Sequence, residues 1–391
     1  MKKNHYLSKH PATSRRKFLS QLSAGVGSSL LAPSSLSMIS SCSPGNSSKE
    51  TASTDTGEEK KKLGLALVGL GNYSTIQLAP ALQECKNCYL AGIITGTPSK
   101  AEEWSAKYNI PEKNIYNYDN YDELADNPDI DIIYVVLPNA MHAKYTIRAA
   151  RAGKHVITEK PMAISVQECE DMIAACKENN VLLGVGYRLH YEPYNKEIMR
   201  LGQEQVFGKV TEINNAFGFT IGDPTQWRMK KELAGGGALM DVGIYTIQAA
   251  RYTSGLEPIS LTAEEFKTDP VKFAEVDETI QFQLNFPEGL VANCEASYNK
   301  NMQYLKATAE NGWFELSPAY DYGPLNGKTS EGPLEFPHLY EQALQMDDFA
   351  SCVMNNQPYT TAPGEEGLQD MKIIEAIYQS IVNSRQEVQI A

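Results

Sequence analysis

The 391-residue sequence has no excess of positive charge, few cysteines and no long uninterrupted hydrophobic run. Its formal net charge is -13, and residues 1–42 are basic without a single acidic residue, so the rest of the chain is more acidic still. An acidic body argues against nucleic acid and against a basic membrane-binding face. The length allows two domains, and the composition fits a protein that binds small neutral molecules.

Cysteine is scattered as well as sparse. The chain has seven cysteines, and an odd number without regular spacing argues against a disulfide framework. Cys85 and Cys88 have the C-x-x-C spacing found in redox and zinc sites. No second pair of cysteines or histidines completes a zinc set, so the sequence favours a structural role for this pair and predicts no metal.

Residues 1–42 are predicted to be an export signal. Ser14-Arg15-Arg16-Lys17-Phe18-Leu19 resembles the twin-arginine signal, and the stretch that follows is too polar for a transmembrane helix. The signal ends in Ile39-Ser40-Ser41-Cys42, which resembles a lipoprotein cleavage box with the lipid on Cys42. An ordinary soluble export signal is the alternative. We expect a periplasmic protein anchored at Cys42, with residues 43–62 as a disordered tether.

A dinucleotide-binding pattern begins at Leu63. The apolar run 63–68 is typical of a strand buried on both faces, and it leads into Gly69-Leu70-Gly71-Asn72-Tyr73-Ser74 and an apolar-periodic helix. Strand, glycine turn and helix form the context in which glycines admit a pyrophosphate to the helix N-terminus. Ser74 occupies the third glycine position, so the pattern is incomplete.

Strands and helices alternate as far as residue 186. This alternation predicts an α/β fold with a doubly wound Rossmann domain over residues 63–186, in which ligands bind at the carboxyl ends of the strands. After the second strand come Thr95, Ser99 and Lys100, with no acid before Glu102. An NAD enzyme usually has an acid there to hold the ribose hydroxyls, so the sequence favours NADP, with NAD as the alternative.

Residues 187–391 are predicted to form an α+β domain. A helix over residues 238–253 is followed by five half-polar strands, and two helices close the chain. The alternation in the strands suits a large open, mainly antiparallel sheet with one face on helices and the other available for association. We expect the last helix to return to the Rossmann domain.

Lys160, Asp241 and Tyr245 are the candidates for a proton-handling site. Lys160 ends a buried strand, and Asp241 and Tyr245 are four residues apart on one face of the predicted helix. A free tyrosine is a poor base near neutral pH, but a neighbouring ammonium favours its phenolate and can also hold a substrate oxygen. The lysine itself is the alternative base. The joint occurrence of these residues with the glycine turn favours catalysis over surface roles.

Several motifs occur together in the order of the Gfo/Idh/MocA oxidoreductase family, which the sequence resembles from Leu63 to the C-terminus. They are Gly69-Leu70-Gly71, Glu159-Lys160-Pro161, residues 187–193, Gln226-Trp227-Arg228 and residues 235–245. Tyr245, where many members have histidine, resembles the glucose–fructose oxidoreductase branch. The resemblance implies that Lys160 is catalytic with Asp241 and Tyr245 as partners.

The resemblance also implies two sets of binding residues. Those that would contact the cofactor are Gly69, Gly71, Asn72, Tyr73, Thr95, Ser99, Lys100, Leu137, Pro138, Asn139, His142, Glu159, Lys160, Arg188, Trp227 and Arg228. Those that would contact a sugar substrate are Lys160, Tyr191, Asp241 and Tyr245.

The function implied is an NADP-dependent sugar oxidoreductase that moves hydride from C1 of an aldopyranose to tightly bound nicotinamide and on to a second sugar carbonyl. An exported enzyme has no free nicotinamide pool, which favours such recycling. The branch retains its cofactor with a proline-rich arm, whereas residues 43–62 contain only Pro44. Alternatives are a redox-neutral NAD-dependent glycosidase or epimerase, a sugar C3 dehydrogenase and a non-catalytic sugar-binding lipoprotein. A homodimer or tetramer through the C-terminal sheet is expected.

Overall fold

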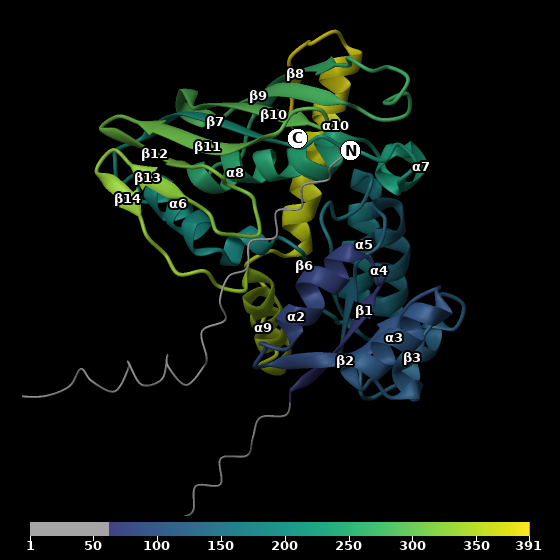
Figure 1. The fold of residues 1–391 in the computed structure, drawn as a ribbon. Helices are drawn as coiled ribbons and strands as arrows, with labels where there is room; N and C mark the ends of the chain where they lie inside the picture. The colour runs from purple at the N-terminus through teal and green to yellow at the C-terminus, as the bar shows by residue number, and fades with distance from the viewer. Residues whose placement is uncertain (1–61, 391) are drawn as a thin grey trace, which may run out of the picture. The chain divides into compact units, whose positions relative to one another are not determined.

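The computed structural model describes residues 62–390 (Figure 1). The predicted export signal, the lipid-attachment residue Cys42 and nearly all of the predicted tether lie outside these residues. Within them, two sheets organise the chain. No helix in this part of the chain is long and apolar enough to cross a membrane.

The first sheet has six parallel strands in the order β3-β2-β1-β4-β5-β6. Their bounds are β1 Leu63–Val68, β2 Cys88–Ile94, β3 Ile115–Tyr116, β4 Ile132–Val135, β5 His155–Thr158 and β6 Leu183–Val185. The central strands are continuous apolar runs because helices cover both of their faces. The strand order reverses between β1 and β4, so a crevice opens at the carboxyl ends of these two strands.

Helices connect these strands. They are α2 Ala79–Leu82, preceded by a π-helical turn at Ser74–Leu78, α3 Pro98–Tyr108, α4 His142–Arg151 and α5 Val166–Glu178. The start of α5 shows how the sequence fixes an end: the Ser165 side chain accepts a hydrogen bond from the backbone N–H of Glu168 (3.2 Å), and the Glu168 carboxylate accepts one from the N–H of Ile164 (3.1 Å). Both bonds satisfy N–H groups at a helix start.

The second sheet has nine strands in the order β14-β13-β12-β11-β7-β10-β9-β8-β15. Only β7 and β10 pair in parallel; all other neighbours are antiparallel. The bounds are β7 Val210–Gly218, β8 Ser260–Phe266, β9 Thr279–Asn285, β10 Val291–Ser297, β11 Met302–Ala309, β12 Gly312–Leu316, β13 Gly327–Thr329, β14 Gly332–Leu334 and β15 Val388–Gln389. The predicted fold class is therefore confirmed.

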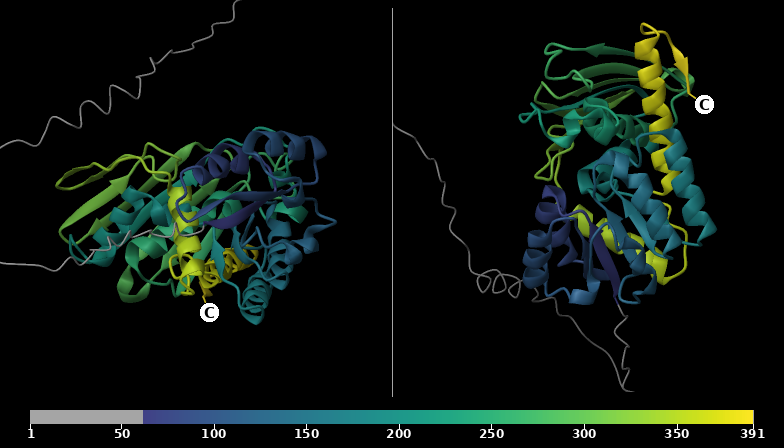
Figure 2. Two further views of the ribbon diagram at one scale, coloured as in Figure 1. Left: turned by 90° about the horizontal axis from the view of Figure 1, so that it is seen from below. Right: turned by 90° about the vertical axis from the view of Figure 1, so that its right-hand side faces the viewer.

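Five helices belong to the second half of the chain: α6 Pro193–Gln203, α7 Lys231–Ala234, α8 Ile244–Ser254, α9 Glu341–Met354 and α10 Gly364–Val382. A π-helical turn at Leu239–Gly243 leads into α8, which packs on β7 and β10. Three of these helices also contact the Rossmann domain, and α7 does so through the turn at Asn139–Met141. α9 packs against α2 and β2, and α10 runs beside α5 and reaches β8, as the views in Figure 2 show.

Candidate active site

The glycine turn after β1 leaves room for a ligand on one side only. Gly69 has φ +93°, and a Cβ on it would lie 2.3 Å from the carbonyl oxygen of Val136, so only glycine fits. A Cβ on Gly71 would meet nothing within 4 Å. The turn therefore packs tightly against the end of β4 at Gly69 and is open at Gly71, as close backbone approach to a pyrophosphate requires.

Ser74, in the third glycine position of the fingerprint, is completely buried. Its hydroxyl donates to the carbonyl oxygen of Gly69 at 2.6 Å. This bond closes the turn on itself. A serine here therefore replaces the usual glycine without opening the turn, which explains how the incomplete pattern still forms the expected structure.

The end of β2 forms the second part of the site. Thr95, Gly96 and Thr97 follow the strand, and the backbone N–H of Thr97 donates to the hydroxyl of Thr95 (3.2 Å). Lys100, in the first turn of α3, donates from Nζ to the carbonyl oxygen of Leu70 (2.8 Å). The lysine thus places a positive charge beside the glycine turn, where a phosphate would lie.

The loops after β4 and β5 are held together by His142. Its side chain is fully buried, with Nε2 2.8 Å from the carbonyl oxygen of Leu137 and Nδ1 2.8 Å from that of Pro161. Asn139 donates from its side-chain amide to the carbonyl oxygen of Ala234 (2.9 Å), which ties the same loop to α7. Both residues line the cleft and also fix the loops that shape it.

Lys160, Asp241, Arg228 and Tyr298 form one polar cluster. Lys160 Nζ donates to the backbone oxygen of Asp241 (2.8 Å) and lies 3.4 Å from its Oδ1. Arg228 Nε donates to Asp241 Oδ2 (2.9 Å), and the Tyr298 hydroxyl donates to the same oxygen (3.1 Å). Asp241 therefore holds two cations and a phenol in place, and it lies in the π-helical turn before α8.

The charges of this cluster are stable at neutral pH. Burial alone would raise the pKa of Asp241, but the cations Arg228 and Lys160 lower it to about 2. Burial works against the Lys160 ammonium, but Tyr245, Asp241 and Glu159 outweigh it and raise the pKa of Lys160 above its ordinary value. An ammonium and a carboxylate thus persist side by side.

Tyr245 lies next to this pair. Lys160 Nζ is 4.7 Å from the centroid of the Tyr245 ring, and the ring packs edge-on against Phe217 at 5.3 Å. Tyr320 packs on it as well, at 6.0 Å. The ring is therefore fixed by aromatic neighbours, and a cation lies over its face.

Three predicted contact residues lie outside the lining of the cleft. Arg188 is buried, pairs with Glu341 (2.9 Å) and stacks on the Tyr322 ring (4.1 Å). Tyr191 donates to Asp348 (2.7 Å), and Ser99 is exposed on α3. Arg188 and Tyr191 thus make contacts within the protein, because helix α9 supplies an acidic partner to each of them.

The remaining predicted residues meet in one cleft of about 700 Å³. Those that line it are Gly69, Gly71, Asn72, Tyr73, Thr95, Lys100, Leu137, Pro138, Asn139, His142, Glu159, Lys160, Trp227, Arg228, Asp241 and Tyr245. Sequence motifs did not indicate the contributions of Gly96, Thr97, Tyr118 and Tyr322, which also line it. The first two follow directly from the end of β2, whereas the tyrosines come from loops without a recognisable pattern.

The lining of the cleft carries groups that suit a dinucleotide. The open side of Gly71 and the Lys100 ammonium suit phosphates, and the lining carries carboxylates only at the far end, on Glu159 and Asp241. Burial raises the pKa of Glu159, whose Oε1 accepts a hydrogen bond from Tyr134 (2.8 Å). The phosphate end is thus cationic, and the other end carries the cluster of Lys160 and Asp241, beside which a nicotinamide ring would lie.

Comparison with known proteins agrees with this geometry. Residues 63–187 match the Gfo/Idh/MocA oxidoreductase family, NAD-binding Rossmann fold, and residues 196–316 match the Gfo/Idh/MocA C-terminal domain. A D-xylose 1-dehydrogenase [NADP(+)] of Haloarcula marismortui is 30% identical over 81% of this chain and 90% of its own. A trans-1,2-dihydrobenzene-1,2-diol dehydrogenase of Xenopus laevis is 35% identical over 62% of this chain and 71% of its own.

A solved structure extends the likeness to three dimensions. The aldose-aldose oxidoreductase of Caulobacter crescentus, complexed with glycerol, superposes with a TM-score of 0.82 at 41% identity, and the match covers 84% of this chain and 100% of that one. Fold and site together define a dinucleotide-dependent oxidoreductase. The chain belongs to the Gfo/Idh/MocA oxidoreductase family and is an NAD(P)-dependent enzyme acting on CH–OH groups. The family predicted from the sequence is confirmed.

Proposed function

We propose that the protein is an NADP-dependent aldose oxidoreductase that oxidises one sugar at C1 and reduces the carbonyl of a second sugar. The first sugar becomes a lactone and the second an alditol, so electrons and protons balance between them. The observation that carries this proposal is the Lys160–Asp241–Tyr245 cluster at the end of a cleft that fits a dinucleotide. The similarity to an aldose-aldose oxidoreductase along that protein's whole length supports it.

In the proposed reaction, bound NADP would accept and donate hydride, and the residues of the chain would handle the oxygen and its proton. Two of the donor positions of Lys160 Nζ are directed at Asp241, which leaves one for the sugar oxygen. Tyr245 would take the hydroxyl proton of the first sugar and return it to the carbonyl oxygen of the second. Because the Lys160 pKa is raised, the lysine stays protonated and Tyr245 is the better candidate for the base.

The direct test follows nicotinamide fluorescence in protein purified without added cofactor. Addition of an aldose such as glucose should raise the fluorescence, and a second sugar should lower it again. Bound cofactor that responds to neither sugar, with release of an aglycone from a glycoside, would favour a redox-neutral glycosidase or epimerase. A 3-keto product would favour a C3 dehydrogenase, and bound cofactor and sugar without any turnover would favour a non-catalytic binding protein.

NADP preference over NAD is expected to depend on Lys100. A change of Lys100→Glu should weaken NADP binding by about 10–100-fold, the effect of losing one charged hydrogen bond, and weaken NAD binding less. Lys107→Glu, an exposed lysine on the same helix outside the cleft, is the matched control. Dissociation constants from fluorescence titration measure both. Equal losses for the two cofactors would place Lys100 at the pyrophosphate instead.

We also propose, from the sequence of residues 1–42, twin-arginine export, a periplasmic location and a lipid anchor at Cys42. Metabolic labelling with a fatty acid should label the wild type and should not label Cys42→Ser.

We also propose that the protein forms a homo-oligomer through the open face of the second sheet. That face carries Gln281 and Gln283 of β9, while the alternate residues of the strand are buried against helices.

A further inference from the structure

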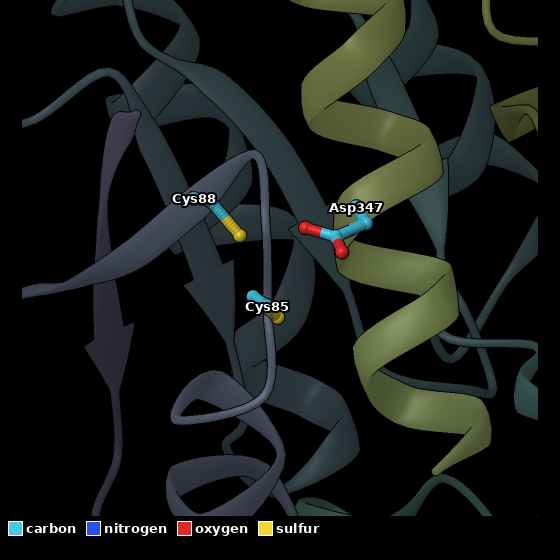
Figure 3. A group of neighbouring side chains, drawn as sticks. All are labelled: Cys85, Cys88 and Asp347. Atoms are coloured by element: carbon cyan, nitrogen blue, oxygen red, sulfur yellow. The ribbon is translucent and has the colours of Figure 1, made fainter. Parts of the chain in front are cut away.

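Cys85, Cys88 and Asp347 meet on the Rossmann domain outside the lining of the cleft. Cys85 lies in the loop between α2 and β2, Cys88 is the first residue of β2, and Asp347 lies in α9. The two sulfur atoms and a carboxylate oxygen all lie within 4.8 Å of one another. Figure 3 shows the Asp347 side chain pointing from α9 towards the two cysteines. Among residues 62–390, no other three His, Cys, Asp or Glu side chains come together in this way.

The cysteines are shielded and weakly bonded. Cys88 is fully buried and Cys85 is 3% exposed. The hydrogen-bond contacts of the Cys85 sulfur to backbone oxygens are long, at 3.5 Å to Ala81 and 3.7 Å to Ala343. Two thiols beside a carboxylate are therefore held out of water without strong partners among the neighbouring backbone groups.

Hydrogen bonds within the protein orient the Asp347 carboxylate without a bound ion. Its carboxylate accepts hydrogen bonds from the backbone N–H groups of Lys86 (2.8 Å) and Asn87 (2.7 Å), the two residues between the cysteines. Its backbone oxygen also accepts one from the Asn87 side chain (3.0 Å). Oδ2 accepts one of these bonds only, which leaves it a lone pair. Metal-ligating carboxylates are commonly held by such outer hydrogen bonds.

We propose that Cys85, Cys88 and Asp347 bind a zinc ion, with a water molecule on the side of the half-buried Asp347 as the fourth ligand. Zinc accepts both thiolate and carboxylate ligands, whereas magnesium and calcium prefer oxygen alone and copper(I) prefers sulfur alone. Binding converts both thiols to thiolates and releases two protons. The ion then offsets two of three negative charges, and the Lys62 ammonium, which donates to the backbone oxygen of Cys85 (2.7 Å), lies nearby.

The ion would fasten α9 to the Rossmann domain. The α2–β2 loop and Asp347 are 260 residues apart in the sequence and are already linked through Asn87. A shared ligand set adds a second link at the same point. The sequence pattern therefore showed no complete set of zinc ligands. The C-x-x-C pair has no second pair near it in the sequence, because its third ligand comes from α9. The inference does not depend on the proposed function.

The test uses the full chain. The protein is reduced, treated with a chelator to remove bound metal, loaded with zinc chloride and then desalted to remove free zinc. About one zinc ion per chain should remain on the wild type, as one complete site holds. Cys88→Ser and Asp347→Asn should weaken zinc binding by at least about 10–100-fold, the range found when even an outer partner is lost. Cys352→Ser, a half-buried cysteine on α9 outside the group, is the matched control and should retain zinc.

Two further readouts keep the result independent of folding and of activity. Cobalt in place of zinc should give the absorption of a tetrahedral ion with thiolate ligands in the wild type and Cys352→Ser only. Zinc should raise the melting temperature of these two proteins and leave that of Cys88→Ser unchanged. Wild type that retains no more zinc than Cys88→Ser, or a Cys85–Cys88 disulfide that persists in untreated protein with zinc present, would overturn the proposal.

Discussion

Tyr245→Phe should lower kcat/KM for sugar oxidation by about 10²–10⁴-fold, the contribution of one positioned acid–base group. The substitution removes only the hydroxyl that would take the sugar proton. The ring contacts with Phe217 (5.3 Å) and Tyr320 (6.0 Å) remain, and so does the cation over the ring. Cofactor affinity, measured by fluorescence titration, should therefore stay unchanged while the rate falls.

Tyr320→Phe is the matched control for this experiment. Tyr320 packs on Tyr245, and its buried hydroxyl has no hydrogen-bond partner among the described residues. Its loss should change the rate little, since no bond is broken and the hydroxyl does not line the cleft. If Tyr245→Phe costs no more than Tyr320→Phe, another group accepts the proton, and Lys160 becomes the candidate.

The Rossmann half of the fold could be predicted from the sequence because its strands are buried on both faces. Such strands appear as short continuous apolar runs, and the predicted 63–68 and 155–158 coincide with β1 and β5. Even the incomplete fingerprint formed the expected turn. Ser74 buries its hydroxyl against Gly69, a solution that a search for three glycines does not anticipate.

The second sheet was predictable only in part. The sequence pattern did not indicate β7, although this strand lies in the middle of the sheet and pairs with both β10 and β11. Its sequence carries Asn214 and Asn215 in the middle, and asparagine is depleted in strands. Pairing on both edges outweighs that preference, and pairing is a tertiary effect that local sequence does not reveal.

The site shows the same division between local and tertiary information. Lys160, Asp241 and Tyr245 carried motif signals, and the structure brings them together. Tyr298 and Tyr322 carried none, because each reaches the site from a distant part of the second half of the chain. The motifs predicted residues that lie near the cleft, but they did not predict the direction in which each side chain points.

Arg188 illustrates that last limit. Its place after β6 suggested a contact with the cofactor, yet its guanidinium pairs with Glu341 and donates to the backbone oxygens of Tyr320 and Asp321. It also stacks on Tyr322, which lines the cleft. A buried arginine needs an acid and further acceptors, and α9 and the loop at residues 320–321 supply them. Arg188 therefore shapes the cleft through the loop that carries Tyr322.

Lys160→Met should lower kcat/KM by about 10²–10³-fold, because it removes a charged donor that would hold the reacting sugar oxygen. Methionine keeps the length of the side chain, so a loss in rate reports the charge. Lys160→Arg keeps the charge and should recover part of the rate. Single-turnover rates of cofactor reduction by sugar, compared at equal saturation, measure the effect.

The pH dependence of the reaction rate distinguishes two roles for Lys160, a charged hydrogen-bond donor and a base. The folded pKa of Lys160 is raised, so its charge, and the stability it contributes, are fully present below the ordinary lysine pKa and are lost only as pH rises through the raised value. The ratio of wild-type to Lys160→Met rates should thus not rise between about pH 6 and about pH 9. A ratio that climbs with pH across that range would mean that the lysine loses its proton there and acts as the base, leaving Tyr245 a supporting role.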